Sequence, residues 1–168
     1  MWFVEARKKK VISIREMRAG EFPGYKDYFI DEYATELVSN YGHSRERARN
    51  IAIAELEEKF PLGVPTPANH LNCIDLVENE TAATVGYLWY ANQSNDLSAF
   101  ICDFYVFEEH RSKGHGKAVV EALENALAEA GIDQIKLRVA YDNRRALSFY
   151  KAVGFEITGY NMAKNIGD

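Results

Sequence analysis

The sequence has few cysteines, no surplus of positive charge and no long apolar run, and each absence excludes a class of protein. Cys73 and Cys102 are the only cysteines among 168 residues, too few for a disulfide framework and too far apart for a paired zinc knuckle. Acidic residues outnumber basic ones, 25 to 20, whereas nucleic-acid proteins depend on a broad cationic surface. No stretch approaches the roughly 18 apolar residues that cross a bilayer. We therefore expect no nucleic-acid partner and no membrane span.

The length and composition are those of one globular domain. Hydrophobic residues make up 47% and charged residues 27% of the chain, which is ordinary for a soluble domain. Residues 1–10 are basic and contain neither an apolar core nor a cleavage site of a secretory signal. We expect residues 1–10 to be disordered, residues 11–168 to form a single domain, and the protein to be cytoplasmic.

Apolar periodicity predicts strands and helices along most of the chain. Strands are expected near 11–15, 71–78, 84–91, 99–107 and 135–139, with a last strand or hairpin arm over 155–164, and helices near 25–39, 44–60, 116–130 and 143–152. A break is expected at Gly20 and Pro23-Gly24. Since 99–107 is almost entirely apolar, it should lie inside a sheet covered on both faces. The order is that of a mixed α/β or α+β domain.

The segment between the apolar strand and the long helix has the composition of a phosphate site. Gly114 and Gly116 allow a sharp turn and the close approach of a ligand. The amides that begin the helix point into this turn, where the helix dipole favours negative charge. Arg111, Lys113 and Lys117 add cations. The pattern predicts a phosphate site, most naturally for a pyrophosphate.

Two common phosphate-binding loops do not fit this segment. A P-loop would need glycine where Arg111 stands and Ser or Thr where Ala118 stands. A dinucleotide fingerprint that begins at Gly114 would need Gly or Ala in place of Val119. On this segment alone, a glycine-containing loop with exposed basic residues explains the pattern equally well.

A second motif, taken together with the first, favours a particular family. The first motif, Arg111-Ser112-Lys113-Gly114-His115-Gly116, follows a strand. The second consists of Asn143, a helix with Ala146 and Tyr150 on one face, and a terminal Gly154-Phe155. The pair, in this order, closely resembles the GNAT superfamily of acyl-CoA-dependent N-acetyltransferases. The resemblance covers residues 84–164, and the earlier elements fit the family's general order without a signature.

The resemblance implies a fold and a cosubstrate. The fold is a mixed central sheet of about six to seven strands, splayed between strands four and five and flanked by about four helices. The cosubstrate is acetyl-CoA, and no metal is implied. Its pantetheine arm would lie in the splay and its pyrophosphate on the glycine loop. The residues implied to contact it are Phe104, Tyr105, Val106, Arg111, Ser112, Lys113, Gly114, His115, Gly116, Lys117, Asn143, Ala146 and Tyr150.

The resemblance also implies catalytic roles. Tyr150 matches the family's usual general acid, because a phenol with a pKa near 10 can protonate a departing thiolate; a core tyrosine is the other interpretation. Asn143 could serve only as a helix cap. Asp103, a carboxylate in an apolar strand, is the candidate base, and a salt bridge to a neighbouring arginine would explain it as well. A bulge near 103–105 would aim a backbone amide at the thioester oxygen.

The leading interpretation is an acyltransferase. It would move the acetyl group of acetyl-CoA to a primary amine of a small molecule or peptide, by direct attack in a ternary complex. A non-catalytic acyl-CoA-binding sensor or interaction module is the alternative, and an unrelated phosphate-binding domain is a third. Tyr150 favours the enzyme, because a binding module needs no proton donor there. The acceptor amine and a homodimeric state stay open.

Overall fold

A computed structural model describes residues 10–166, and the chain separates into two units. The first comprises Met1–Phe22 and Phe60–Arg138, and the second comprises Pro23–Lys59 and Val139–Asp168. Each unit is described by itself, and a single domain over residues 11–168 stays a prediction. The expected disorder of residues 1–10 falls outside the described residues except for Lys10.

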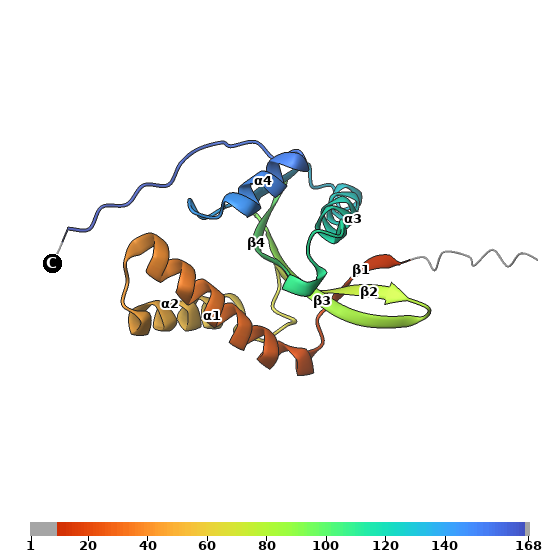
Figure 1. Cartoon of the computed structure of the whole chain (residues 1–168), viewed down its shortest axis with the longest axis horizontal. Helices are drawn as coiled ribbons and strands as arrows, with labels where there is room; N and C mark the ends of the chain where they lie inside the picture. Colours follow the sequence, from red (N-terminus) through yellow and green to blue (C-terminus); the bar gives the residue numbers. More distant parts are fainter. Residues whose placement is uncertain (1–9, 167–168) are drawn as a thin grey trace, which may run out of the picture. The chain divides into compact units, whose positions relative to one another are not determined.

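The first unit contains one mixed β-sheet (Figure 1). Its strands, in the spatial order β1-β2-β3-β4-β5, are β1 (Val11–Glu16), β2 (Asn69–Glu78), β3 (Thr81–Asn92), β4 (Ser98–Val106) and β5 (Gln134–Leu137). Neighbouring strands pair antiparallel except β4 and β5, which are parallel. The predicted α+β architecture is confirmed, although the described residues form five strands rather than six or seven.

A two-residue turn sets the register of the long β2–β3 hairpin. Asn79 and Glu80 have φ values of 51° and 64°, which is the backbone of a type I′ turn. Its twist matches that of the flanking strands, so Glu78 pairs directly with Thr81. The turn lies between the strands that the sequence predicts near 71–78 and 84–91.

One face of the sheet is covered by α3 (His115–Glu129), which packs against β1 and β4. Its inner stripe of Val119, Val120, Leu123 and Leu127 is buried, each side chain contributing about 1.5–3 kcal/mol by leaving water. Gly131 follows with φ 80°, as expected for the residue that ends a helix.

A partly buried ion cluster ties β1, β2 and β3 together. The Arg15 guanidinium donates from Nε to Asp75 Oδ2 at 2.7 Å, and from Nη1 and Nη2 to the two Glu21 oxygens at 2.9 and 2.8 Å. Thr84 Oγ1 donates to the other Asp75 oxygen at 2.8 Å. Asp75, only 6% exposed, is thus fully engaged. Burial raises the pKa of the neighbouring Cys73 thiol to about 11, so this cysteine stays protonated.

The ion cluster predicts a loss of stability in acid. The hydrogen bonds from Arg15 lower the pKa of Glu21 from its ordinary 4.5 to about 2. A carboxyl with a depressed pKa stabilises the fold above pH 4.5, and this contribution disappears as the pH falls toward 2. We expect Glu21→Gln to lower the free energy of unfolding at pH 7 by about 1–2 kcal/mol, after allowance for solvent screening, and to flatten its pH dependence between 4.5 and 2.

Urea unfolding at several pH values measures this effect. Glu129→Gln, at an exposed position on α3, is the control and should leave both the stability and its pH dependence nearly unchanged. Equal pH profiles for wild type and Glu21→Gln would contradict the account of the cluster.

The second unit is helical. It holds most of α1 (Phe22–Tyr41), together with α2 (Arg45–Lys59) and α4 (Arg144–Ala152). Ala34, Leu37 and Ala48 form a buried contact between α1 and α2. The Ser44 hydroxyl caps α2 by accepting from the Arg47 N–H at 3.2 Å.

Two sequence predictions about helices and strands are wrong. Pro23-Gly24 does not precede α1 but lies within its first turn, where backbone N–H groups have no helical partner and the missing N–H of proline costs no hydrogen bond. The strand predicted over 155–164 is not formed: within the described residues, 155–166 have no strand pairing, and Tyr160 and Met162 are 82% and 95% exposed. A strand needs a neighbouring edge, and high β-propensity alone does not supply one.

The helices of residues 10–166 include none that is long and apolar enough to cross a bilayer.

Candidate active site

Strand β4 separates from β5 part-way along its length. The parallel pairing ends at Ile101↔Leu137, whereas β4 continues to Val106. The register of β4 against β3 shifts after Ile101, which leaves Cys102 as the extra residue of a β-bulge. The splay expected between strands four and five is confirmed, and the bulge lies one residue before the expected range 103–105.

Beyond the bulge, alternate residues of β4 direct their backbone groups away from β3. The Phe107 N–H donates to the Val85 carbonyl at 2.8 Å, and such bonds recur at every second residue of an antiparallel pair. The backbone of Tyr105 therefore faces β3. The N–H and C=O groups of Phe104 and Val106 point to the opposite side, from which β5 has diverged. This edge can accept an extended chain that carries amide groups.

The loop after β4 contains two residues in the left-handed region. The 3-10 turn Glu108–His110 is followed by Ser112 with φ 59° and Gly114 with φ 82°. Gly114 is the N-cap of α3 and accepts a hydrogen bond from the Ala118 N–H at 3.2 Å. The N–H groups of residues 115–117 come before the first helical hydrogen bond, so they have no acceptor within the helix and point into the loop. The described first turn of α3 has no acidic residue, so the loop is suited to an anion.

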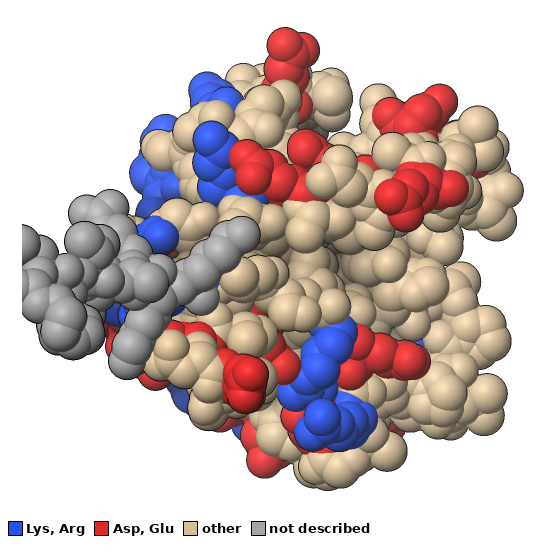
Figure 2. Space-filling view, turned by 90° about the vertical axis from the view of Figure 1, so that its right-hand side faces the viewer, with Lys and Arg blue, Asp and Glu red and all other residues tan. Residues whose placement is uncertain are grey.

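Lysine side chains lie on this loop and at the start of α3. Lys113 Nζ donates to the Glu109 carbonyl at 2.7 Å, which turns its ammonium toward the backbone. Lys117 Nζ lies 3.7 Å from the Glu121 carboxylate on the exposed face of α3. On the face drawn in Figure 2, basic side chains gather beside acidic ones rather than in one continuous positive surface.

Two histidines stand at the two ends of the loop. The rings of His110 and His115 are 6.5 Å apart. Burial lowers the pKa of His115, and electrostatic repulsion from neighbouring basic side chains lowers it further, which favours the neutral form of its imidazole. Within residues 10–166 no group of three or more His, Cys, Asp or Glu side chains is arranged to hold a metal ion.

The Arg111 side chain, expected at the pyrophosphate, contacts β4. Its Nε donates to the Val106 carbonyl at 2.7 Å, and its guanidinium carbon lies 4.9 Å above the Tyr105 ring. Sequence reasoning missed this contact. The pairing of β3 with β4 determines that the Val106 carbonyl faces the splay. The path of the chain over the five residues from Val106 to Arg111 determines that the arginine can reach this carbonyl.

Asp103, the candidate base, directly follows the bulge. It pairs in register with Trp89 on β3, and its side chain is half-buried. The argument that a lone buried acid needs a partner applies better to Asp75, which the sequence analysis did not single out and which is the most buried carboxylate among residues 10–166. The signal for it was a charged residue between the apolar Ile74 and Leu76 in β2.

The remaining predicted site residues belong to the second unit. The Asn143 side chain accepts a hydrogen bond from the Ala146 N–H at 3.0 Å and caps α4, which is the capping role left open by the sequence. The side chain of the preceding Asp142 accepts from the Ser39 hydroxyl at 2.8 Å. Tyr150 is half-buried on α4.

Two aromatic rings hold the Tyr150 ring. The ring centroid of Phe149 lies 5.2 Å from that of Tyr150, and the ring centroid of Phe155 lies 5.4 Å from it in an edge-to-face arrangement. Such pairs fix ring orientation, and Phe155 is the aromatic residue of the second motif. The core and functional interpretations of Tyr150 are therefore compatible, since packing would hold the hydroxyl in place.

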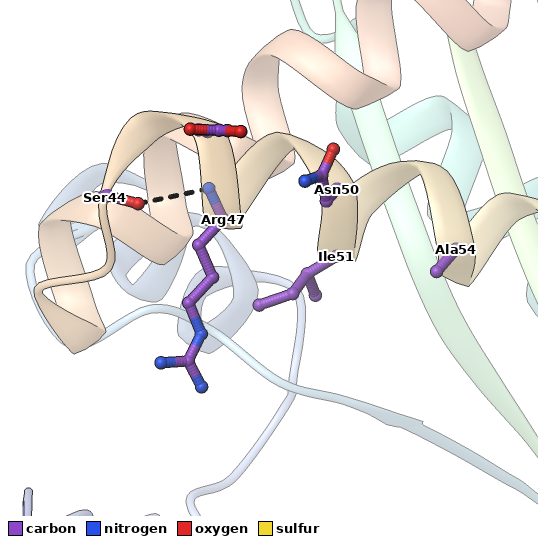
Figure 3. A pocket seen from close by; sticks show the side chains of 6 residues that line it. Ser44, Arg47, Asn50, Ile51 and Ala54 are labelled. Atoms are coloured by element: carbon purple, nitrogen blue, oxygen red, sulfur yellow. Dashed lines mark hydrogen bonds between the residues drawn. The ribbon is translucent and has the colours of Figure 1, made fainter.

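An open hollow of about 470 Å³ lies on α2 (Figure 3). It is lined by Ser44, Glu46, Arg47, Asn50, Ile51 and Ala54. All of these come from one helix or its cap, and they combine one cation, one anion and apolar carbons. None is a predicted site residue, and the hollow lacks the run of amides that the β4 loop provides.

Comparison with known proteins decides the family. The model of the Acetyltransferase (GNAT) family matches residues 25–155. The chain belongs to the GNAT acetyltransferase family. Over 92% of this chain and 99% of the relative, it is 31% identical to the N-acetyltransferase YycN of Bacillus subtilis. The crystal structure of YycN matches with a TM-score of 0.84 over 94% of this chain and all of that one.

One further relative and one further solved structure carry named activities. The L-amino acid N-acetyltransferase AaaT of Escherichia coli is 28% identical over 74% of this chain and 86% of its own. The structure of spermidine N-acetyltransferase from Vibrio cholerae, in complex with CoA and spermine, matches with a TM-score of 0.62 at 17% identity, over 88% and 82% of the two chains. This likeness shows the fold. Family membership makes the protein an acyltransferase, as predicted.

Proposed function

We propose that this protein transfers the acetyl group of acetyl-CoA to a primary amine of a small molecule or peptide. The observation that carries the proposal is the divergence of β4 from β5 at Cys102, followed by a loop with two left-handed residues at the N-terminus of α3. A strand edge and an anion-binding loop in series suit a ligand that has an amide-bearing arm attached to a pyrophosphate.

The residues present fit such a donor. The N–H and C=O groups of Phe104 and Val106 would pair with the amides of its pantetheine arm, because they face the splay. The backbone from Ser112 to Lys117 would hold its pyrophosphate, with the positive end of the α3 dipole beside it. Gly114, at φ 82°, permits the turn that brings these amides together. Arg111 and Lys113 belong to the same loop, and His115 and Gly116 form the first turn of α3.

The donor supplies an acyl thioester, and the chain supplies orientation and proton transfer. A backbone amide beside the bulge would donate to the thioester oxygen, where negative charge develops as the amine attacks. Asp103 would accept the proton that an ammonium must lose before it can attack. Tyr150 would donate a proton to the leaving thiolate, and Asn143 and Ala146 would support the donor from the start of α4.

Both proteins with named activities act on amines, in keeping with an amine acceptor here. The carboxylates of α1 and α2, which include Asp31, Glu32 and Glu57 on exposed surface, suit a cationic amine, and a solvated helix face accounts for them equally well. The alternative within the same fold is a non-catalytic acyl-CoA-binding module. The presence of Tyr150 favours the enzyme.

Release of free CoA, measured with a thiol reagent across a panel of amines, tests the proposal. The panel includes polyamines, aminoglycosides, amino acids and peptides with free N-termini. We expect at least one primary amine to accelerate thiol release above the rate of donor hydrolysis, with a product heavier by one acetyl group. Tight binding of CoA without transfer to any amine would instead identify a binding module.

A further inference from the structure

Arg111 couples the glycine loop to the end of β4. Its Nε–H donates to the Val106 carbonyl at 2.7 Å, a length typical of a strong, charge-assisted hydrogen bond. Its own backbone N–H donates to the Glu108 carbonyl at 3.1 Å and closes the 3-10 turn. The residue therefore holds both the turn that leaves β4 and the last carbonyl of that strand.

The carbonyl that Arg111 holds faces the splay. The hydrogen bond from the Phe107 N–H to the Val85 carbonyl shows which residues of β4 direct their backbone groups toward β3. Because these groups alternate along an antiparallel strand, the Val106 C=O points away from β3. A carbonyl at the end of a strand, without a neighbouring strand to align it, is free to tilt. The hydrogen bond from a permanently charged guanidinium sets its direction.

Aromatic side chains support the guanidinium from the sheet. It lies over the Tyr105 ring, 4.9 Å from the centroid, and a planar cation stacks well on such a face. The ring centroids of Tyr105 and Phe107 lie 6.1 Å apart, and those of Phe107 and Tyr87 lie 5.3 Å apart. Tyr87 pairs in register with Tyr105. The guanidinium therefore has a defined place on β3 and β4.

We propose that Arg111 is a positioning residue for the donor's pantetheine arm, acting through the Val106 carbonyl, and not a ligand of the phosphates. This inference rests on the proposed function. Lys117 serves as the contrast, because its side chain is 69% exposed at the start of α3 and has no carbonyl of β4 to hold. Loss of Arg111 should thus harm any donor that carries the arm, whereas loss of Lys117 should harm only donors that carry phosphates.

Steady-state kinetics with acetyl-CoA and with S-acetylpantetheine, which lacks the phosphates, separates the two roles. We expect Arg111→Ala to lower kcat/KM for both donors by the same factor, about tenfold, as for loss of one charge-assisted hydrogen bond. Lys117→Ala should lower kcat/KM for acetyl-CoA alone. An effect of Arg111→Ala confined to acetyl-CoA would overturn the inference.

Two conservative variants sharpen the test. Arg111→Gln keeps a planar N–H donor without charge, and Arg111→Lys keeps the charge without the planar group. We expect glutamine to restore most of the activity with both donors and lysine to restore little. The reverse order would assign Arg111 to the phosphates.

Hydrogen–deuterium exchange of the ligand-free protein gives a readout that needs no donor. We expect Arg111→Ala to speed the exchange of amides in 104–110, while Lys117→Ala leaves them unchanged. If neither donor is turned over by the wild type, the proposed function fails, and the exchange data still decide whether Arg111 holds β4. Unchanged exchange in Arg111→Ala would overturn the inference whatever the kinetics.

Discussion

Tyr150→Phe is expected to lower kcat by about 10²–10⁴-fold, the usual contribution of a general acid, while the Kd for acetyl-CoA stays within about twofold. The phenyl ring of the variant keeps the contacts with Phe149 and Phe155, so the fold should be unaffected. The proton donor is lost, and the thiolate must then leave without protonation. Thiol-release kinetics measure kcat, and calorimetric titration measures Kd.

Tyr160→Phe is the matched control for this variant. Tyr160 is 82% exposed and lies outside both motifs, so its loss of a hydroxyl should change neither kcat nor Kd. A Tyr150→Phe enzyme with wild-type kcat would remove Tyr150 from the mechanism. Equal losses in both variants would indicate an effect unrelated to proton donation.

Gly114→Val is expected to raise the Kd for acetyl-CoA by about 10–100-fold. A β-branched residue at φ 82° is strained by about 1–3 kcal/mol, and the loop relieves this strain by turning its amides away from the pyrophosphate. A steric clash of the new side chain is not the cause of the strain, since no heavy atom lies within 4 Å of a Cβ added there. Calorimetric titration of acetyl-CoA into the variant measures the change.

Gly131→Val supplies the comparison from the other end of the same helix. Gly131 has φ 80° and an equally open surrounding, so valine there carries the same backbone strain. We expect both variants to lose similar stability and only Gly114→Val to lose acetyl-CoA affinity. A similar loss of affinity in both would mean that helix stability, and not the loop amides, controls binding.

Local patterns predicted most elements of the fold, because their signals act over a few residues. The helices expected over 116–130 and 44–60 correspond to α3 and α2, and the strands expected over 71–78 and 84–91 correspond to β2 and β3. The final strand over 155–164 could not be decided in this way. Its formation depends on a partner edge far away in sequence.

The site was predictable in its segments but not in its contacts. The glycine spacing identified the loop, and the apolar run identified β4. The bulge at Cys102 depends on the register between β3 and β4, which single-strand patterns do not contain. The buried carboxylate proved to be Asp75 rather than Asp103, because burial follows from how the strands pair and not from the polarity of neighbours in sequence. The direction of Arg111 likewise depends on where the Val106 carbonyl points.

The central claim is that the β4 edge and the loop before α3 bind acetyl-CoA. Thermal unfolding of the wild-type protein with acetyl-CoA, CoA, ATP or NAD, each at the same concentration, tests it most directly. Binding at about 100 times Kd stabilises a protein by about 2.7 kcal/mol, or about 5–10 °C in Tm for a chain of this size. The account predicts such a shift with acetyl-CoA and CoA and little with ATP or NAD. A shift with ATP or NAD but none with CoA would contradict it.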